Sequence, residues 1–181
     1  MNSVRDPSQP ENCERSRARA TLVQVRSDTL DVARILMREY ADSLAIDLAY
    51  QGFDQELAGL PGDYANPRGT LLIAWAGGEP AGLCALRALD LPEPSDAAEM
   101  KRLYVRPKHR HGGIGRQLAL AIIGEAIARG YRYLMLDTLE AMASAQRLYE
   151  GLGFVPIEPY RLPAHPLARH YRLALEQPEQ P

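Results

Sequence analysis

The alternation of apolar and polar side chains predicts short strands separated by helices. Residues 21–26 (Thr-Leu-Val-Gln-Val-Arg) alternate with a period of two, which is typical of a half-buried strand. Apolar runs at 70–76 and 81–89 bracket the turn sequence Gly-Gly-Glu-Pro and predict a hairpin. Further strands are expected over residues 98–105, 131–137, 153–155 and 170–175.

Apolar residues recur at helical spacing between these strands. One helix is expected after a cap at Ser27 or Asp28 and through about Leu48, and a short second helix over 53–60. A third, over 113–129, is apolar on two sides, which indicates burial against a sheet. A fourth covers 141–151. The order β-α-α-β-β-β-α-β-α-β-β predicts a mixed α/β sheet covered by helices.

Length and composition indicate one globular domain. The chain has 181 residues, 46% of them hydrophobic and 24% charged, which is an ordinary composition for a protein with a single core. We expect a disordered polar tail over residues 1–20, one domain over 21–176 and a frayed end over 177–181.

The sequence shows no sign of a membrane or secretory segment. No apolar run approaches the ~20 residues that span a bilayer, and the first residues lack the apolar part of a signal peptide. A cytoplasmic location without a membrane partner is therefore expected. The two cysteines are too few for a disulfide framework, and Cys84, in an apolar strand, is expected to be a buried small hydrophobe.

Charge is distributed unevenly along the chain. The net charge of −2 argues against a general nucleic-acid-binding protein, which is usually strongly basic. Residues 28–66 hold eight acids and two bases, whereas Lys101 to Arg116 carries six positive charges and no acid. Two such poles suit a protein that brings an anionic cofactor to a cationic substrate. An acidic helix surface that only keeps the protein soluble is the simpler interpretation.

The segment 99–116 carries the strongest chemical signal. It predicts a strand, a basic loop and the first turn of a helix, with Gly112, Gly113 and Gly115 allowing a ligand to approach the backbone closely. The N-terminus of the helix offers unpaired N–H groups and the positive end of its dipole. These features predict a site for a phosphate-bearing ligand, with a solvated basic turn as the alternative.

Two short motifs resemble one known family. The loop has neither the Gly-x-x-x-x-Gly-Lys-Ser/Thr run of a Walker loop nor glycines placed directly after a strand as in a dinucleotide fingerprint. Instead, Arg-His-Gly-Gly-Ile-Gly at 110–115 resembles the acetyl-CoA pyrophosphate loop of the Gcn5-related N-acetyltransferase (GNAT) superfamily. Ala-x-x-Leu-Tyr-Glu-x-x-Gly-Phe at 145–154 resembles a later block of the same family. The likeness covers about residues 21–176.

The resemblance implies a fold and a reaction. The fold is an α/β GNAT fold, with a mixed, mostly antiparallel sheet of about seven strands, about four helices and a splay at the cofactor site. The reaction is acetyl transfer from acetyl-CoA to a primary amine by direct attack in a ternary complex, without a metal, and relatives are often homodimers. The implied acetyl-CoA contacts are Leu103, Tyr104, Val105, Arg110, His111, Gly112, Gly113, Ile114, Gly115, Arg116, Met142 and Ala145. At the position of Met142, relatives often carry an asparagine that bonds the cofactor.

The resemblance also implies two catalytic side chains. Tyr149 would protonate the leaving thiolate, which suits a phenol of pKa ~10 that is still protonated at neutral pH. Glu99 would take a proton from the amine through water, and a plain strand-edge charge is an equally good interpretation. Regular alternation would place Glu99, Lys101, Leu103 and Val105 on one face, unless a bulge intervenes.

The sequence defines the acceptor less well. Carboxylates and aromatic rings of segment 28–66 can receive a cationic amine. Tyr160 and Arg161 are expected to close over the pocket, where Arg161 suits a substrate carboxylate. An amine-bearing small molecule is the first expectation, and a protein lysine or N-terminus the second. His165 and His170 lack metal-ligand spacing and are expected to be solvated surface residues.

Two other functional classes stay open on the residues alone. A non-catalytic module that binds or senses an acyl-CoA would also carry the loop, although Tyr149 is present and no second domain is evident. A protein that binds ATP through the glycines would need a carboxylate for Mg²⁺, for which Asp137 is the obvious candidate. No Ser or Thr follows Gly115 to share that metal.

Overall fold

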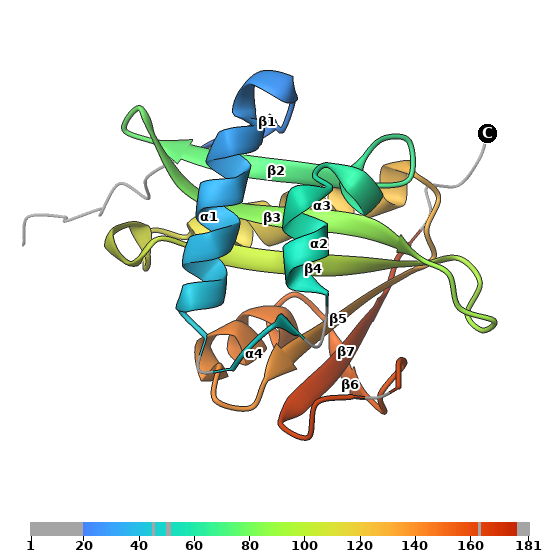
Figure 1. Ribbon diagram of the computed structural model, residues 1–181. Helices are drawn as coiled ribbons and strands as arrows, with labels where there is room; N and C mark the ends of the chain where they lie inside the picture. Colours follow the sequence, from blue (N-terminus) through green and yellow to red (C-terminus); the bar gives the residue numbers. More distant parts are fainter. Residues whose placement is uncertain (1–19, 45, 50–51, 163, 177–181) are drawn as a thin grey trace, which may run out of the picture.

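The computed structural model describes residues 20–44, 46–49, 52–162 and 164–176 (Figure 1). These residues form a seven-stranded sheet in the order β1-β2-β3-β4-β5-β7-β6. The strands are β1 (Thr21–Gln24), β2 (Thr70–Ala76), β3 (Glu79–Leu89), β4 (Ala97–Val105), β5 (Tyr133–Leu139), β6 (Val155–Ile157) and β7 (Ala168–Ala174). The α-helices are α1 (Leu30–Asp42), α2 (Phe53–Ala58), α3 (Ile114–Ala128) and α4 (Ala143–Glu150).

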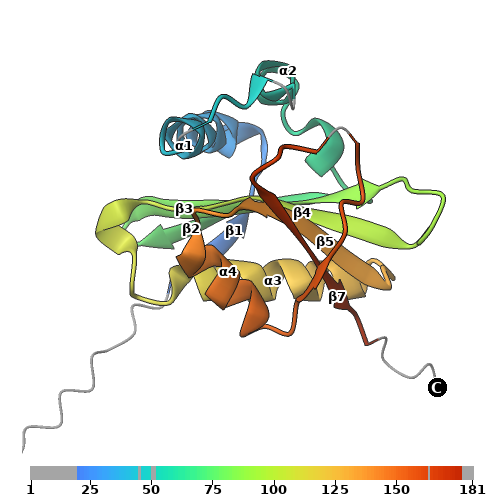
Figure 2. The same cartoon turned by 90° about the horizontal axis from the view of Figure 1, so that it is seen from below.

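The predicted mixed, mostly antiparallel sheet is confirmed. Every neighbouring pair of strands runs antiparallel except β4 and β5, which are parallel. Helices α1 and α2 cover one face of the sheet, and α3 and α4 lie against the other (Figure 2). The central strands are therefore covered on both sides, which explains their nearly continuous apolar sequences.

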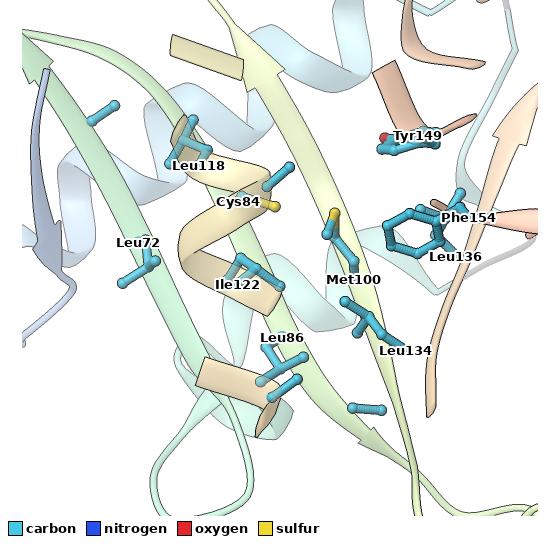
Figure 3. Packing of buried hydrophobic residues seen from close by; sticks show 14 of the residues in the cluster. Leu72, Cys84, Leu86, Met100, Leu118, Ile122, Leu134, Leu136, Tyr149 and Phe154 are labelled. Atoms are coloured by element: carbon cyan, nitrogen blue, oxygen red, sulfur yellow. The ribbon is translucent and has the colours of Figure 1, made fainter. Parts of the chain in front are cut away.

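Each face of the sheet carries its own apolar core. The core under α3 joins sheet residues to the helix (Figure 3), among them Leu72, Cys84, Leu86, Met100, Leu118 and Ile122. The core under α1 contains the alternate strand positions, such as Leu71, Ile73 and Leu83, with Ala33, Leu36 and Met37 of the helix. The expectation of a buried Cys84 is confirmed, and burial raises the pKa of its thiol.

The first helix is shorter than predicted. It ends at Asp42 rather than near Leu48. The Ser43 hydroxyl donates to the carbonyl oxygen of Tyr40 at 2.7 Å, a local bond that competes with continued helix. The Asp47 carboxylate then accepts the N–H of Ala49 at 2.8 Å and shapes a turn.

The structure does not test the predictions for the chain ends, the domain bounds and the location. Residues 1–19 of the tail predicted over 1–20, and the frayed end predicted over 177–181, lie outside the described residues. In the described ranges, no helix has both the length and the apolar character needed to cross a bilayer. The domain bounds and the cytoplasmic location therefore stay predictions.

A bulge interrupts β4 where it pairs with β3. Leu83 pairs with Tyr104, but Ala85 pairs with Lys101, so residues 102–103 share one position opposite β3. A bulge adds one residue to a strand and reverses which face the following side chains occupy.

The prediction that Glu99, Lys101, Leu103 and Val105 share one face of β4 is wrong, because the bulge lies between them. Leu103 and Val105 pack against the core under α3. The neighbours of Glu99 on the strand also pack into that core, so Glu99 and Lys101 point to the opposite face. At the bulge itself, Arg102 has a φ of 59°, a conformation that non-glycine residues seldom adopt.

The parallel strands β4 and β5 separate at the middle of the sheet. They pair over residues 97–99 and 133–135, and in the described structure the ladder stops there. Strand β4 continues to Val105 and β5 to Leu139, so their remaining lengths diverge. This splay creates the cavities considered next.

Candidate active site

A cleft opens where β4 and β5 separate, and we call it the splay cleft. Its walls come from both strands, from the turn before α4 and from the segment after α1. The lining residues are Tyr40, Leu44, Ile46, Leu48, Met100, Lys101, Arg102, Leu103, Asp137, Thr138, Leu139, Met142 and Tyr149. The cleft thus brings together segments that lie about a hundred residues apart in the sequence.

The glycine-rich loop lies directly before α3. His111 has a φ of 68° and Gly113 a φ of 84°, so the chain turns sharply just before the helix begins at Ile114. A side chain at Gly113 would be strained because of this left-handed backbone. The backbone N–H groups of the first helical turn have no partner within the helix and suit a phosphate.

The basic charges of this region are mostly engaged already. Four of the six predicted cations form ion pairs: Lys101 with Asp137, Arg102 with Glu56, Arg106 with Glu39 and Lys108 with Glu79. In the portion of the chain that is described, neither Arg110 nor Arg116 forms an ion pair with a carboxylate. Arg110 instead donates from Nε to the carbonyl oxygen of Val105 at 2.9 Å. Of the six cations, Arg110 and Arg116 therefore stay available for the predicted phosphate-bearing ligand.

Tyr149 lies in α4 and forms part of the wall of the splay cleft. Its ring lies beside Phe154 (Figure 3), with 5.8 Å between the ring centroids. The centroid of the Tyr171 ring lies 6.3 Å away, and Tyr149 is 6% exposed. Burial raises the pKa of its hydroxyl well above the usual value, so the phenol is protonated at neutral pH. Its environment suits a proton donor.

The predicted residues of α4 surround the same cleft. Met142 immediately precedes the helix, and its Sδ lies 3.7 Å from the Thr138 hydroxyl. Ala145 is half-buried one turn later. The amide that relatives often carry at position 142 is missing, and Gln146 instead donates to the carbonyl oxygens of Leu139 and Glu140 at 3.1 and 2.8 Å.

A second, charged cavity of about 290 Å³ adjoins the splay cleft. The residues that line it are Glu56, Arg87, Glu99, Lys101, Arg102, Asp137, Tyr160, Arg161, Leu162, Ala164, His165, Ala168 and His170. Lys101, Arg102 and Asp137 line both cavities, which therefore meet at these side chains. The expectation that Tyr160 and Arg161 border a pocket agrees with this arrangement.

Glu99 lies in the charged cavity and is 1% exposed. Its carboxylate accepts hydrogen bonds from Arg87 at 2.7 Å and from the Tyr160 hydroxyl at 2.8 Å. Lys101 and Arg161 each lie 3.7 Å away. Burial alone would raise the pKa of Glu99, but the charges of Lys101, Arg87 and Arg161 outweigh it and lower the pKa. The carboxylate is therefore ionised and heavily engaged.

The expectation that His170 is a solvated surface residue is wrong. It is 9% exposed, lines the charged cavity and lies opposite Asp137 in the β5–β7 ladder. Its ring meets the edge of Tyr160 at 5.2 Å and an interplanar angle of 89°. The available signal was its place in a predicted strand, where alternate side chains face the protein. His165 also lines the cavity, and its Nδ1 accepts the N–H of Leu167 at 3.2 Å.

Segment 28–66 presents part of the predicted acidic surface, because Asp28, Asp31, Asp42, Asp47, Asp54 and Asp63 are exposed, but its two glutamates are engaged with arginines. Glu39 pairs with Arg106, and Glu56 is buried against Arg102. Tyr64 is buried in the core under α1 and donates its hydroxyl to Glu56 at 2.6 Å. Tyr50 lies outside the described residues.

Comparison with known proteins decides the family. The model of the acetyltransferase (GNAT) family matches residues 30–154. The chain belongs to the GNAT family. The fission yeast Schizosaccharomyces pombe has an uncharacterized N-acetyltransferase, C1271.07c, that is 38% identical over 132 residues, or 72% of this chain and 79% of that protein.

Two further known proteins resemble this GNAT protein. N-acetylaspartate synthetase of Danio rerio is 29% identical over 137 residues, 67% of this chain and 48% of that protein. The structure of yncA, a putative acetyltransferase from Salmonella typhimurium with its cofactor acetyl-CoA, matches with a TM-score of 0.65 at 18% identity, covering 91% of this chain and 98% of that one. The family match and the N-acetyltransferase from fission yeast show that the GNAT protein is an acyltransferase, and acetyl-CoA as its acyl donor agrees with the family.

Proposed function

We propose that this GNAT protein transfers the acetyl group of acetyl-CoA to the primary amine of a small molecule that also carries a carboxylate. The observation that carries the proposal is the junction of the two cavities. The splay cleft holds Tyr149, the charged cavity holds Arg161, and both cavities share Lys101 and Asp137.

The splay cleft and the loop before α3 fit acetyl-CoA. The backbones of Leu103, Tyr104 and Val105 border the splay, where no strand pairs with this edge of β4 in the described structure. Such an edge offers hydrogen-bond partners to the amides of an extended pantetheine chain. The phosphates then reach the start of α3, with Arg110 and Arg116 beside them, and the bound molecule supplies an activated acetyl thioester.

Tyr149 fits the role of general acid. The thiolate that leaves the thioester must gain a proton, and the buried phenol holds one at neutral pH. The ring is fixed by Phe154 and Tyr171, so the hydroxyl keeps its place in the cleft wall. Such proton transfer typically contributes roughly 10²–10⁴-fold in rate.

The charged cavity fits a small zwitterionic or anionic amine. Three of its carboxylates are each paired with a cation: Glu56 with Arg102, Glu99 with Arg87 and Asp137 with Lys101. Arg161 remains as the surplus cation, 45% exposed and 3.7 Å from the already paired Glu99. A substrate carboxylate can reach it and form charge-assisted hydrogen bonds.

Two further considerations support this acceptor class. The cavity of about 290 Å³ lies at the lower end of the roughly 300–1,000 Å³ of small-molecule sites, which suits an amino-acid-sized ligand. The Danio rerio relative is named for the synthesis of N-acetylaspartate, an N-acetylated amino acid. A homodimer, expected from the resemblance, stays a prediction.

The acceptor class is tested by substituting Arg161. We expect Arg161→Gln to raise the KM for a carboxylate-bearing amine roughly 10–100-fold, because a hydrogen bond to a charged group contributes about 1.5–3 kcal/mol. The KM for acetyl-CoA should be unchanged, and so should activity toward an amine without a carboxylate. Thiol release measured over a panel of amino acids, simple amines and a lysine peptide reports these values.

The matched control is Arg169→Gln. Arg169 is exposed and pairs with Glu140, and it does not line the charged cavity. Its substitution should leave both KM values unchanged. A wild-type enzyme that prefers the lysine peptide or the carboxylate-free amines would contradict the proposed acceptor class, and thiol release with no amine would contradict the proposed reaction.

A further inference from the structure

The imidazole of His170 is an unexplained polar group in the interior. Among the described residues, neither its Nδ1 nor its Nε2 has a hydrogen-bond partner, although the side chain is only 9% exposed. Buried polar atoms are nearly always bonded, so such a group calls for a ligand or a function. The imidazole is part of the wall of the charged cavity.

His170 lies next to the junction of the two cavities. The β5–β7 ladder places it directly opposite Asp137, which lines both the splay cleft and the charged cavity. The edge contact with Tyr160 holds the ring in place. His170 therefore lies in the wall of the charged cavity, beside a residue that also lines the splay cleft.

The carboxylates of the cavity are poorer proton acceptors. Glu99 accepts from Arg87 and Tyr160, with Lys101 also nearby, and these cations lower its pKa. Asp137 pairs with Lys101 at 2.9 Å, and its pKa is also lowered. An ionised carboxylate held by cations has little tendency to take another proton. Glu99 as the base remains a competing proposal that the same experiment tests.

The charged groups around His170 determine its protonation state. Those that act on it are Asp137 of β5, Glu99 and Lys101 of β4, and Glu158 before Tyr160. The same cavity also holds Arg87, Arg102, Arg161 and Glu56. Burial outweighs the attraction of the carboxylates and lowers the pKa of the imidazole below its usual value. At neutral pH the ring is therefore neutral and has a free lone pair.

We propose that His170 is a catalytic residue that accepts the proton of the substrate ammonium group. The proposal rests on the acetyl transfer to an amine proposed above. One N–H bond of the ammonium breaks and its proton passes to the imidazole, which leaves a neutral amine. The amine lone pair then forms the C–N bond to the thioester carbon, and the C–S bond breaks.

The protons balance as follows. The nitrogen loses a second proton after attack, and the leaving thiolate gains one from Tyr149, which is reprotonated from that nitrogen. The amide keeps one hydrogen, and the imidazolium returns its proton to solvent. Neither an oxidant nor a metal ion takes part in this balance. Glu99 acts in this scheme as a positioning residue that holds Arg87 and Tyr160.

The test is the pH dependence of kcat for wild-type enzyme and His170→Gln. Wild-type kcat should fall as the pH drops through the histidine pKa, below its usual value of about 6.5. His170→Gln should lose this acid limb and reduce kcat roughly 10²–10⁴-fold at neutral pH, as removal of a general base does. Acetyl-CoA affinity measured by calorimetry should be unchanged, which also shows that the variant is folded.

A second measurement separates catalysis from a structural role. An amine whose own pKa lies below the assay pH is already neutral, so its acetylation needs no base. The deficit of His170→Gln should shrink to a few-fold with such an amine. His165→Gln, a substitution of the same kind in the wall of the same cavity, should keep the acid limb.

Two results would overturn the role of His170. One is an acid limb that persists in His170→Gln but disappears in Glu99→Gln, which would assign the proton to Glu99. The other is an equal loss with neutral and protonated amines, which would make His170 a structural residue. In either case wild-type acetylation still stands, whereas the absence of any acetylated amine with wild-type enzyme would refute the proposed function itself.

Discussion

At the scale of single residues, Tyr149 is a buried tyrosine in the apolar core under α3 that also lines the splay cleft. The phenol ring lies between Phe154 and Tyr171, and the hydroxyl keeps its proton because burial raises its pKa. This is the protonation state that a thiolate leaving group requires. Removing the hydroxyl alone should therefore affect the chemical step and little else.

We expect Tyr149→Phe to bind acetyl-CoA as the wild type does and to reduce the single-turnover rate roughly 10²–10⁴-fold. Calorimetry gives the affinity, and rapid mixing gives the rate. Tyr171→Phe is the control, because its hydroxyl bonds Glu150 at 3.1 Å and does not line the splay cleft. A Tyr149→Phe variant with full single-turnover rate would show that the thiolate leaves without this acid.

The sequence predicted Tyr149 and the loop glycines because their motifs are local. The spacing of Gly113 and Gly115 before an apolar helix specifies a turn and an exposed helix N-terminus within a few residues. The buried position of His170 was not predicted, because no residue within a few positions along the chain indicates that Asp137 and Tyr160 lie beside it. The ion pair between Arg102 and Glu56 spans 46 positions and is equally invisible to local patterns.

At the scale of elements, α2 is attached to the sheet by a buried ion pair. Glu56 of α2 accepts two hydrogen bonds from Arg102, at 2.9 Å from Nε and 2.6 Å from Nη2, and a third from Tyr64. The Arg102 side chain is 2% exposed and also stacks near the rings of Tyr40 and Phe53. The pair joins α2 to the residue of β4 that has the left-handed backbone at the bulge.

Substituting Glu56 should therefore destabilise the fold. We expect Glu56→Gln to cost roughly 3–5 kcal/mol of unfolding free energy, because it leaves a buried guanidinium without its carboxylate. The double variant Glu56→Gln/Arg102→Met should recover much of this loss. Urea denaturation measures the unfolding free energy of the single and double variants. A loss in the double variant that equals the sum of the two single losses would contradict the coupling of the two side chains.

The same pair gives the stability a pH dependence. Burial would raise the pKa of Glu56, but Arg102 and Tyr64 outweigh it, so the folded pKa lies below the unfolded one. The stabilisation is then present above the ordinary glutamate pKa and is lost as the pH falls through the lowered folded value. The difference between wild type and Glu56→Gln should accordingly shrink in acid.

Element types were predictable, but their ends and irregularities were not. The apolar periods identified the strands and four helices correctly. At the end of α1 the Ser43 hydroxyl bonds the backbone, and at the β4 bulge Arg102 forms a long-range ion pair, and neither contact leaves a trace in the apolar periodicity. The bulge mattered most, because it moved Leu103 and Val105 to the other face of the sheet from Glu99.

At the scale of the whole molecule, the acidic segment 28–66 and the basic segment 101–116 form ion pairs with each other. Glu39 and Glu56 of the acidic segment neutralise Arg106 and Arg102 of the basic one. The proposed phosphate site then consists of the helix N-terminus, Arg110 and Arg116. In the proposed function, the splay cleft takes the donor and the charged cavity the acceptor, on the two sides of one junction, as direct transfer requires.

The central claim is direct attack of the amine on acetyl-CoA while both are bound. Initial velocities measured with acetyl-CoA and a carboxylate-bearing amine both varied test it most directly. The account predicts reciprocal plots that intersect, and mass spectrometry that shows an acetylated amine and an unmodified protein. Parallel plots, together with an acetyl group carried covalently by the protein, would contradict it, because the acetyl group would then leave CoA before the amine arrives.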